Sequence, residues 1–333
     1  MSQHVVISVD AVGGDLGSEP MLEGSLMALE ADPNLEIILC GPADVVEPFA
    51  AKHDRITAHA TTEVISMGEH PALAVRKKKD SSIVAGCRLV KEGVAQGFFS
   101  PGSTGACLAA ATLVMGRIKG VARPAMATIL PSPIKPVVMC DVGANADCKP
   151  AYLVQFAQMA SIYAEKVIGI DNPTCALLNI GEEEAKGSQF AQEAHALLKE
   201  QVPGFIGNCE GRDLLDCKAD VVVTDGFTGN VALKTVEGVA SVLFGSLKNI
   251  MKSSPITMLG ALTMKKGLSD LKDLVSADTY GGAPMLGVKG ACIVGHGSSN
   301  ATAVKNGILV AAKCVRLDVS GLIAQVVKKP DSN

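Results

Sequence analysis

Short apolar runs rich in Val, Ile and Leu alternate with helical patterns along this chain, and each run ends in a polar loop. The runs with their loops are "VVISVDAVGGD" (5–15), "EIILCGP" (36–42), "FFSPGSTG" (98–105), "VVMCDVGAN" (137–145), "CALLNIGEE" (175–183), "DVVVTDGFTGN" (220–230) and "ACIVGHGSS" (291–299). Apolar residues at three- and four-residue steps indicate helices at 81–93, 151–167 and 188–202. Strands that alternate with helices pair in parallel, and near-continuous apolar strands are buried on both faces. The pattern therefore predicts an α/β fold with a mostly parallel sheet between helices, as a single domain over residues 1–333.

The composition fits an aliphatic core and excludes several classes of protein. With 48% hydrophobic but only 3% aromatic residues, the core must consist of small aliphatic side chains. A net charge of −4 argues against a nucleic-acid partner. Ten cysteines without a CxxC pair indicate reduced thiols of a cytoplasmic protein. "MSQHVVISVD" (1–10) lacks the basic region of a signal peptide, and no segment approaches the ~18 apolar residues of a membrane span.

The polar loops have the features of an anion-binding cleft. In parallel α/β folds, ligands bind beyond the carboxyl ends of the strands, which we expect to meet at one edge of the sheet. The loops "GSTGA" (102–106), "GFTGN" (226–230) and "HGSSNA" (296–301) place backbone N–H groups at a helix N-terminus, where the helix dipole favours an anion. Helix capping explains any one of them more simply. Several at one edge favour a polar cleft, to which "DVGANADCKP" (141–150) also belongs.

Familiar cofactor and nucleophile fingerprints are missing from the sequence. No GxxxxGK[ST] occurs, and "GGDLGSEP" (13–20) is not the GxGxxG of dinucleotide-binding folds. There is no GxSxG elbow, and neither Ser103 nor Cys140 has an evident histidine partner for covalent catalysis. The carboxylates that could form a magnesium site are Asp10, Asp15, Asp141, Asp147 and Asp225. Loop capping and ion pairs are favoured for them, so no metal and no cofactor are expected.

Five longer motifs, in this order, resemble the phosphate acyltransferase family of bacterial phospholipid synthesis. They are "DAVGGDLGSEP", "DVGANADCKPAYLVQFAQMA", "LLNIGEEEAKG", "DGFTGNVALKTVEG" and "YGGAPMLGVKGACIVGHGSS". The resemblance extends from Val5 to about Val315, and a small departure is Val12, where a methionine is expected. It implies that inorganic phosphate attacks the thioester of a long-chain acyl–acyl carrier protein, giving acyl phosphate and free carrier protein.

The resemblance also implies the architecture and surroundings of the protein. The fold would be a three-layer α/β/α sandwich like that of isopropylmalate dehydrogenase, without a cofactor. The protein would be a cytoplasmic homodimer attached peripherally to the inner face of the membrane. There, a membrane-bound acyl phosphate:glycerol-3-phosphate acyltransferase would take the product for phospholipid synthesis.

This chemistry needs hydrogen-bond donors more than a strong base. Phosphate is already anionic and nucleophilic at neutral pH, so the site must hold it against the thioester carbonyl and stabilise the oxyanion. The candidate catalytic donors are Asn145, Lys149, Lys186, Asn230, Lys234 and His296. The candidate phosphate- and substrate-binding residues are Asp10, Gly13, Gly14, Asp15, Ser103, Thr104, Gly105, Asp141, Asp147, Asn179, Glu182, Asp225, Thr228, Gly229, Gly281, Gly282, Gly297 and Ser298. The sequence does not rank the donors.

A cluster of basic residues suggests where the carrier protein docks. "VRKKKDSS" (75–82) brings together Arg76, Lys77, Lys78 and Lys79 at the start of a helix. A solvated helix face explains the cluster equally well. The functional alternative is a landing patch for an acidic carrier protein, where charge complementarity mainly raises the association rate.

Residues 229–275 predict a protruding helical hairpin that makes dimer and membrane contacts. A first helix carries an apolar stripe, "SSP" interrupts it, and the apolar "ITMLGALTMKKGL" (256–268) follows. Five lysines stand against one aspartate over 241–272, and apolar residues with a basic surplus suit a membrane surface. The expected membrane contacts are Met258, Leu259, Leu262, Lys265 and Lys266. Dimer or core packing is the simpler explanation of the same residues.

Three other functions stay open at this point. A phosphate acetyl- or butyryltransferase that uses acyl-CoA differs only in its acyl donor. A decarboxylating hydroxyacid dehydrogenase on the related fold would need an arginine-rich carboxylate site, and the strand-end loops contain no arginine. A membrane-associated scaffold for lipid-synthesis enzymes would account for the hairpin and the basic cluster, but not for the strand-end loops.

Overall fold

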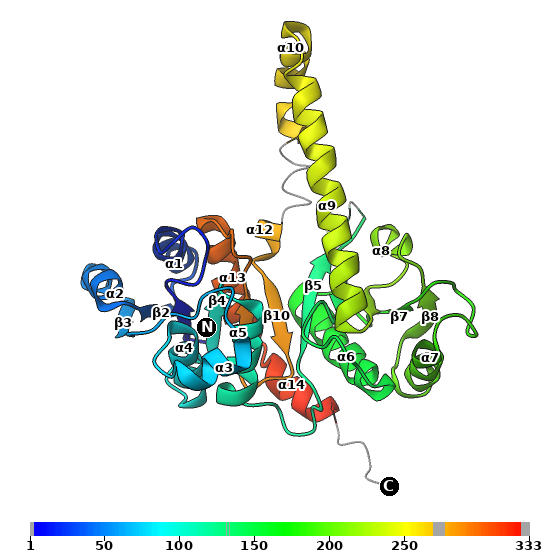
Figure 1. Ribbon diagram of the computed structural model, residues 1–333, viewed down its shortest axis with the longest axis horizontal. Coiled ribbons are helices and arrows are strands. Elements are labelled where there is room, and N and C mark those ends of the chain that lie inside the picture. Colours follow the sequence, from blue (N-terminus) through cyan, green and yellow to red (C-terminus); the bar gives the residue numbers. More distant parts are fainter. Residues whose placement is uncertain (1–2, 131, 133, 269–276, 328–333) are drawn as a thin grey trace.

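The computed structural model describes residues 3–130, 132, 134–268 and 277–327, without the side chains of residues 259, 277 and 278 (Figure 1). The strands are β1 (Val5–Asp10), β2 (Leu35–Gly41), β3 (Ile56–Ala60), β4 (Gly97–Ser100), β5 (Ala125–Leu130), β6 (Val137–Cys140), β7 (Cys175–Leu178), β8 (Phe205–Cys209), β9 (Val221–Val223), β10 (Ala283–Leu286) and β11 (Ala291–Val294). The helices are α1 (Glu19–Ala31), α2 (Ala43–Ala50), α3 (Pro71–Lys77), α4 (Ser82–Lys91), α5 (Thr104–Ala110), α6 (Pro150–Tyr163), α7 (Gln189–Gln201), α8 (Asp213–Asp216), α9 (Gly226–Met251), α10 (Pro255–Thr263), α12 (Ala277–Tyr280), α13 (Ala301–Arg316) and α14 (Val319–Val326). The predicted mostly parallel α/β sheet, with helices on both sides, is confirmed.

The sheet contains two sets of parallel strands that run in opposite directions. Its order is β3-β2-β1-β4-β11-β10-β5-β6-β9-β7-β8, and the pairs β11–β10, β10–β5 and β5–β6 are antiparallel. Three successive reversals turn the second set against the first. The expectation that all strand-end loops meet at one edge was therefore wrong.

The two sets of carboxyl ends nevertheless lie close together. The last residue of β11, Val294, pairs with Ala283 at the start of β10, and the last residue of β6, Cys140, pairs with Ala127 in β5. Since Met285 of β10 pairs with Met126 of β5, only a few residues separate the two ends along the short antiparallel strands. The loops from both sets therefore face a shared space at the centre of the molecule.

The core consists of aliphatic side chains, as the composition predicts, with Phe98, Phe99, Phe156 and Tyr163 as its largest buried members. All ten cysteines are free, and nine of them are buried. Burial raises the pKa of Cys107 to about 12, so a core thiol of this kind stays protonated and unreactive at neutral pH.

Helix α9 projects from the body of the molecule, and α10 lies at its outer end (Figure 1). The 26 residues of α9 give this helix a length of about 39 Å. Ser254 caps α10: its hydroxyl accepts the N–H of Thr257, and the Thr257 hydroxyl accepts the N–H of Ser254. The predicted hairpin 229–275 includes residues 269–275, which lie outside the described part of the chain. Within the described residues, no helix is both long and apolar enough to cross a membrane.

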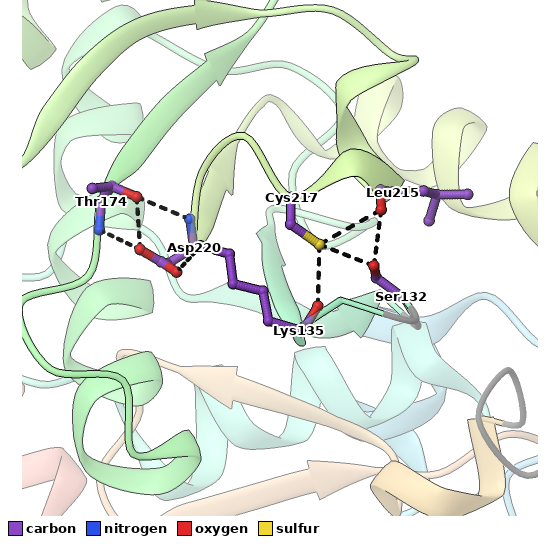
Figure 2. A network of polar contacts seen from close by, with 6 residues as sticks. All are labelled: Ser132, Lys135, Thr174, Leu215, Cys217 and Asp220. Atoms are coloured by element: carbon purple, nitrogen blue, oxygen red, sulfur yellow. Dashed lines mark hydrogen bonds and ion pairs between the residues drawn. The ribbon is translucent and has the colours of Figure 1, made fainter.

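A polar network fixes the opposite, amino-terminal ends of β6, β7 and β9 (Figure 2). The Lys135 ammonium lies 2.6 Å from Asp220, whose other carboxylate oxygen accepts the N–H and hydroxyl of Thr174 at 2.9 and 2.6 Å. The Cys217 thiol contacts the Ser132 hydroxyl at 3.0 Å. Burial alone would raise the pKa of Asp220, but the hydrogen bonds from Lys135 and Thr174 outweigh it and lower that pKa. The network therefore stabilises the sheet away from the cleft.

Candidate active site

The loop after β1 is built around a buried carboxylate. Asp10 accepts hydrogen bonds from the Ser100 hydroxyl at 2.7 Å and from the N–H of Val12 at 3.2 Å. Burial raises the pKa of Asp10, against the lowering effect of its hydrogen bonds from Ser100 and Ser82. A Cβ at Gly13 would lie 2.2 Å from the Asp10 carboxylate, so this close approach requires glycine. Asp10 and Gly13 therefore hold the loop after β1 against the carboxyl end of β4.

The loops after β1 and β11 contact each other directly. The N–H of Asp15 donates to the carbonyl oxygen of Gly297 at 2.7 Å, and a Cβ at Gly297 would lie 2.5 Å from the Asp15 carboxylate. His296 Nδ1 accepts the N–H of Ser298 at 3.3 Å and lies 2.8 Å from the Ser298 hydroxyl. In the neutral ring, the proton therefore lies on Nε2, which can donate a hydrogen bond to a ligand.

The loop after β4 presents the N-terminus of α5. Ser103 caps the helix, because its hydroxyl accepts the N–H of Ala106 at 3.4 Å. The first N–H groups of a helix have no partner within it, and here they belong to Thr104 and Gly105. Gly105 lies tightly against α3, since a Cβ there would be 2.5 Å from the Pro71 ring. The predicted anion-binding N-terminus is thus fixed in position by α3.

The loop after β6 is organised by Asp141. Its carboxylate accepts the N–H groups of Met126 at 3.0 Å, Ala144 at 3.0 Å and Asn145 at 2.7 Å. The Asn145 side-chain amide donates both to Asp141 at 2.8 Å and to the Pro124 carbonyl at 2.7 Å. Burial raises the pKa of Asp141, while these hydrogen bonds oppose the shift. One amide hydrogen is used within the loop and the other on the Pro124 carbonyl before β5, so this geometry favours a positioning role for Asn145 over the substrate donation that the sequence suggested.

Helix α9 begins directly on this loop. A Cβ at Gly229 would lie 2.0 Å from the carbonyl oxygen of Asp141. Asp225 caps the helix by accepting the N–H of Thr228 at 2.8 Å, and the Thr228 hydroxyl donates back to Asp225 at 2.7 Å. Asp225 and Thr228 therefore satisfy each other. Asn230, which follows Gly229 in the helix, lines a cavity at the centre of the molecule.

A cavity of about 380 Å³ lies where the two sets of strands meet. Its polar side chains are Thr104, Thr128, Asn230, Lys234, Glu237, Tyr280 and His296, and its backbone contributions include Gly105, Gly143 and Gly282. The Lys234 ammonium lies 2.7 Å from Glu237, one turn along the exposed face of α9. Four of the predicted catalytic or binding side chains thus share one space: Thr104, Asn230, Lys234 and His296.

Other predicted residues lie elsewhere. Asn179, Asp225 and Thr228 line a separate hollow of about 270 Å³ beside α7 and α9. Glu182 pairs with Lys218 at 2.9 Å. Asp147, Lys149 and Lys186 are exposed and outside the central cavity, and Gly281 packs against the backbone of α13. Apart from Gly281, which precedes β10, these residues all lie in loops or helix starts that follow a strand, so the sequence could not separate them from the cavity residues.

The apolar part of the cavity was not predicted. It is lined by Met126, Ile129, Val142, Leu233, Val236, Ala240, Ala283 and Val294. The three- and four-residue steps of Leu233, Val236 and Ala240 in "GFTGNVALKTVEGVA" were a usable signal. The β5 residues gave none, since their strand pairs with β10 from a distant part of the chain.

The carboxylates do not gather into a metal site. Across the described ranges, no group of three or more His, Cys, Asp or Glu side chains is arranged to hold a metal ion. Asp10 instead accepts the Ser100 hydroxyl of β4 and the N–H of Val12, Asp141 accepts N–H groups of its own loop, and Asp225 caps α9.

Comparison with known proteins places the chain in a family. A family model described as "Fatty acid synthesis protein" matches residues 5–322. The chain is 47% identical over 327 residues to the phosphate acyltransferase of Desulfitobacterium hafniense, covering 97% of this chain and 96% of that one. It is 49% identical over 315 residues to the phosphate acyltransferase of Heliobacterium modesticaldum, covering 93% and 94%.

A solved structure shares the fold. The phosphotransacetylase from Streptococcus pyogenes superposes with a TM-score of 0.56 at 16% identity, covering 94% of each chain. At this identity the likeness concerns the fold alone. The family model and the close relatives both cover nearly the whole chain, which therefore belongs to the fatty acid synthesis protein family.

Proposed function

We propose that the protein transfers a long-chain acyl group from acyl carrier protein to inorganic phosphate, giving acyl phosphate for phospholipid synthesis. The observation that carries the proposal is the central cavity, which joins anion-binding groups to an apolar wall. Such a space fits a reaction between an anion and an aliphatic thioester. Acyl transfer to phosphate is also the activity for which its relatives are named.

Phosphate would bind between the two sets of loops. The N–H groups at the start of α5 and the helix dipole attract an anion there. Lys234 adds a positive charge in the same cavity, held in place by Glu237. His296 can donate from Nε2. These groups come from three different elements, so they can hold phosphate in one orientation against the thioester carbonyl.

The reaction transfers an acyl group without oxidation or reduction, so it needs no redox cofactor. A phosphate oxygen forms a bond to the thioester carbon, and the carbonyl oxygen becomes an oxyanion that donors such as Asn230 and His296 stabilise. The C–S bond breaks as the carbonyl re-forms. The proton of hydrogen phosphate ends on the departing thiolate, so the products are acyl phosphate and the carrier-protein thiol.

The test is a direct assay. The purified protein is incubated with inorganic phosphate and a long-chain acyl carrier protein, and acyl phosphate is trapped with hydroxylamine as the hydroxamate. Product should appear only when phosphate is present. Turnover that requires a nicotinamide cofactor and a hydroxyacid would refute the proposal and favour the dehydrogenase alternative. Acyl-CoA donors in the same assay distinguish a CoA-dependent acetyl- or butyryltransferase.

Two of the four basic residues that the sequence suggested for carrier-protein docking lie together along one groove. Arg76 and Lys79 line a groove of about 460 Å³ together with Arg88 and the exposed Leu113. Lys78 is instead paired with Glu69 at 2.7 Å, and Lys77 lies outside the groove. Since α3 also packs against α5 at Gly105, a carrier protein docked here would lie beside the cavity. We therefore propose this groove as the docking surface for the acidic carrier protein.

The projecting helices support a homodimer at an anionic membrane. On α9, Val239, Val242 and Leu243 are more than half exposed, which suits packing against a second copy. At the outer end, Ile256, Met258 and Leu262 are 83%, 54% and 67% exposed, beside the exposed Lys265 and Lys266. The side chain of Leu259 lies outside the described part. A tip of this composition suits the inner face of the membrane, where the membrane-bound acyl phosphate:glycerol-3-phosphate acyltransferase would take the product.

A further inference from the structure

The wall that α9 contributes to the cavity carries two adjacent rows of side chains. The polar row is Asn230, Lys234 and Glu237, and the apolar row is Leu233, Val236 and Ala240. Steps of three and four residues keep both rows on one face of the helix. The apolar residues are half-buried within this single chain. The apolar row rises about 10 Å from Leu233 to Ala240. From Asn230, where the polar row begins, to Ala240 the helix rises about 15 Å, which is comparable to an extended acyl chain of medium length.

Strand β5 forms the opposite wall of the cavity and also extends away from the polar strand ends. Met126 lies at the polar end, since its N–H donates to Asp141. Ile129 lies three residues further along the strand, about 10 Å from that end. Figure 1 shows β5 beside the inner half of α9, and both elements line the cavity. Apolar side chains of α9 and β5 therefore face the cavity beside the polar row of α9.

We propose that this apolar groove between α9 and β5 binds the aliphatic chain of the acyl donor, and that Ala240 limits the chain length. The inference rests on the proposed function. The thioester would lie at the Asn230 end, beside the phosphate-binding groups, and the methyl end of the chain would lie towards Ala240. An aliphatic chain needs no hydrogen-bond partner, so the apolar row can cover it without cost. Each methylene that enters should improve kcat/KM about fourfold, which corresponds to about 0.8 kcal/mol.

The test shortens the groove in steps. Ala240→Leu and Ala240→Phe add increasing bulk at its far end. Ser241→Phe is the matched control, because Ser241 is exposed and does not line the cavity. The kcat/KM is measured with saturated acyl–carrier protein donors from medium to long chains. We expect the preferred donor to become shorter from the wild type to Ala240→Leu and again to Ala240→Phe. The kcat/KM should fall about fourfold for each excluded methylene, so the loss should be smallest for the shortest donors.

A binding measurement separates this inference from the proposed function. Displacement of a fluorescent fatty acid by palmitate reports on the groove without turnover, and Ala240→Phe should weaken palmitate more than a shorter acid. If the wild type binds palmitate in this way but forms no acyl phosphate, the proposed function fails and the groove assignment stands. A chain-length profile unchanged in folded Ala240→Phe, or an equal loss for every length, would overturn the assignment. A change of oligomeric state in Ala240→Phe alone would also overturn it, because a second copy would then fill the groove.

Discussion

Replacing Gly229 with alanine should disturb the contact that seats α9 on the loop after β6. The new Cβ would lie 2.0 Å from the Asp141 carbonyl oxygen, and a backbone atom cannot move aside as the end of a side chain can. Overpacking of this kind costs about 1–3 kcal/mol, while alanine in a helix gains up to about 1 kcal/mol over glycine. We therefore expect a net destabilisation of about 1–2 kcal/mol.

The same substitution should also reduce the rate of the reaction, and this loss should be larger, as a free energy, than the loss of stability. A shift of α9 moves Asn230 and Lys234 relative to the N-terminus of α5, and a displacement of about 1 Å can cost on the order of 100-fold in rate. The matched control is Gly238→Ala on the same helix, where a Cβ meets nothing within 4 Å. That variant should be more stable by about 0.5–1 kcal/mol and fully active.

Urea unfolding and the hydroxamate assay measure both effects. Gly229→Ala should unfold at lower urea than the wild type, and Gly238→Ala at higher urea. The reasoning is refuted if Gly229→Ala is as stable and as active as Gly238→Ala, because the helix would then not depend on its contact with Asp141.

Three further predictions concern separate parts of the molecule. His296→Ala should lower kcat by about 10²–10³, as expected for loss of an oxyanion or phosphate donor, while Lys149→Ala, outside the cavity, should keep nearly full activity in the same assay. Leu262→Glu places a charge on the exposed tip and should reduce co-sedimentation with anionic vesicles without lowering the rate in solution; undiminished sedimentation would contradict the membrane proposal. Since the folded-state pKa of Asp220 is lowered, its stabilising effect is present above its unfolded pKa and is lost as pH falls through the folded value. Lys135→Met removes one cause of that shift and should begin acid unfolding at a higher pH, as measured by urea midpoints over a pH series; an unchanged pH dependence would contradict this account.

The sequence by itself determined the class of fold and the kind of chemistry. The strands appear as short, nearly continuous apolar runs, and the helices appear as apolar residues at three- and four-residue steps. Both patterns are local, so they are sufficient to predict strands, helices and their alternation. Gly, Ser and Thr at the starts of helices were likewise visible without a structure, as at Ser103 and Thr104. The resemblance added the family, and the comparisons confirmed it.

Only the tertiary structure decided which of the strand-end residues act together. The reversal of strand direction depends on β10 pairing with β5, which joins Met285 to Met126 across nearly half of the chain. The role of Asn145 depends on the Pro124 carbonyl, which lies outside its loop. The role of Lys234 depends on the cavity that α9 forms with β5, and no local pattern in the sequence of β5 predicts that cavity. A polar side chain can donate to a substrate or to its own loop with similar energy. The choice depends on the geometry of acceptors that folding brings together, and that geometry is not encoded in the residues on either side of it.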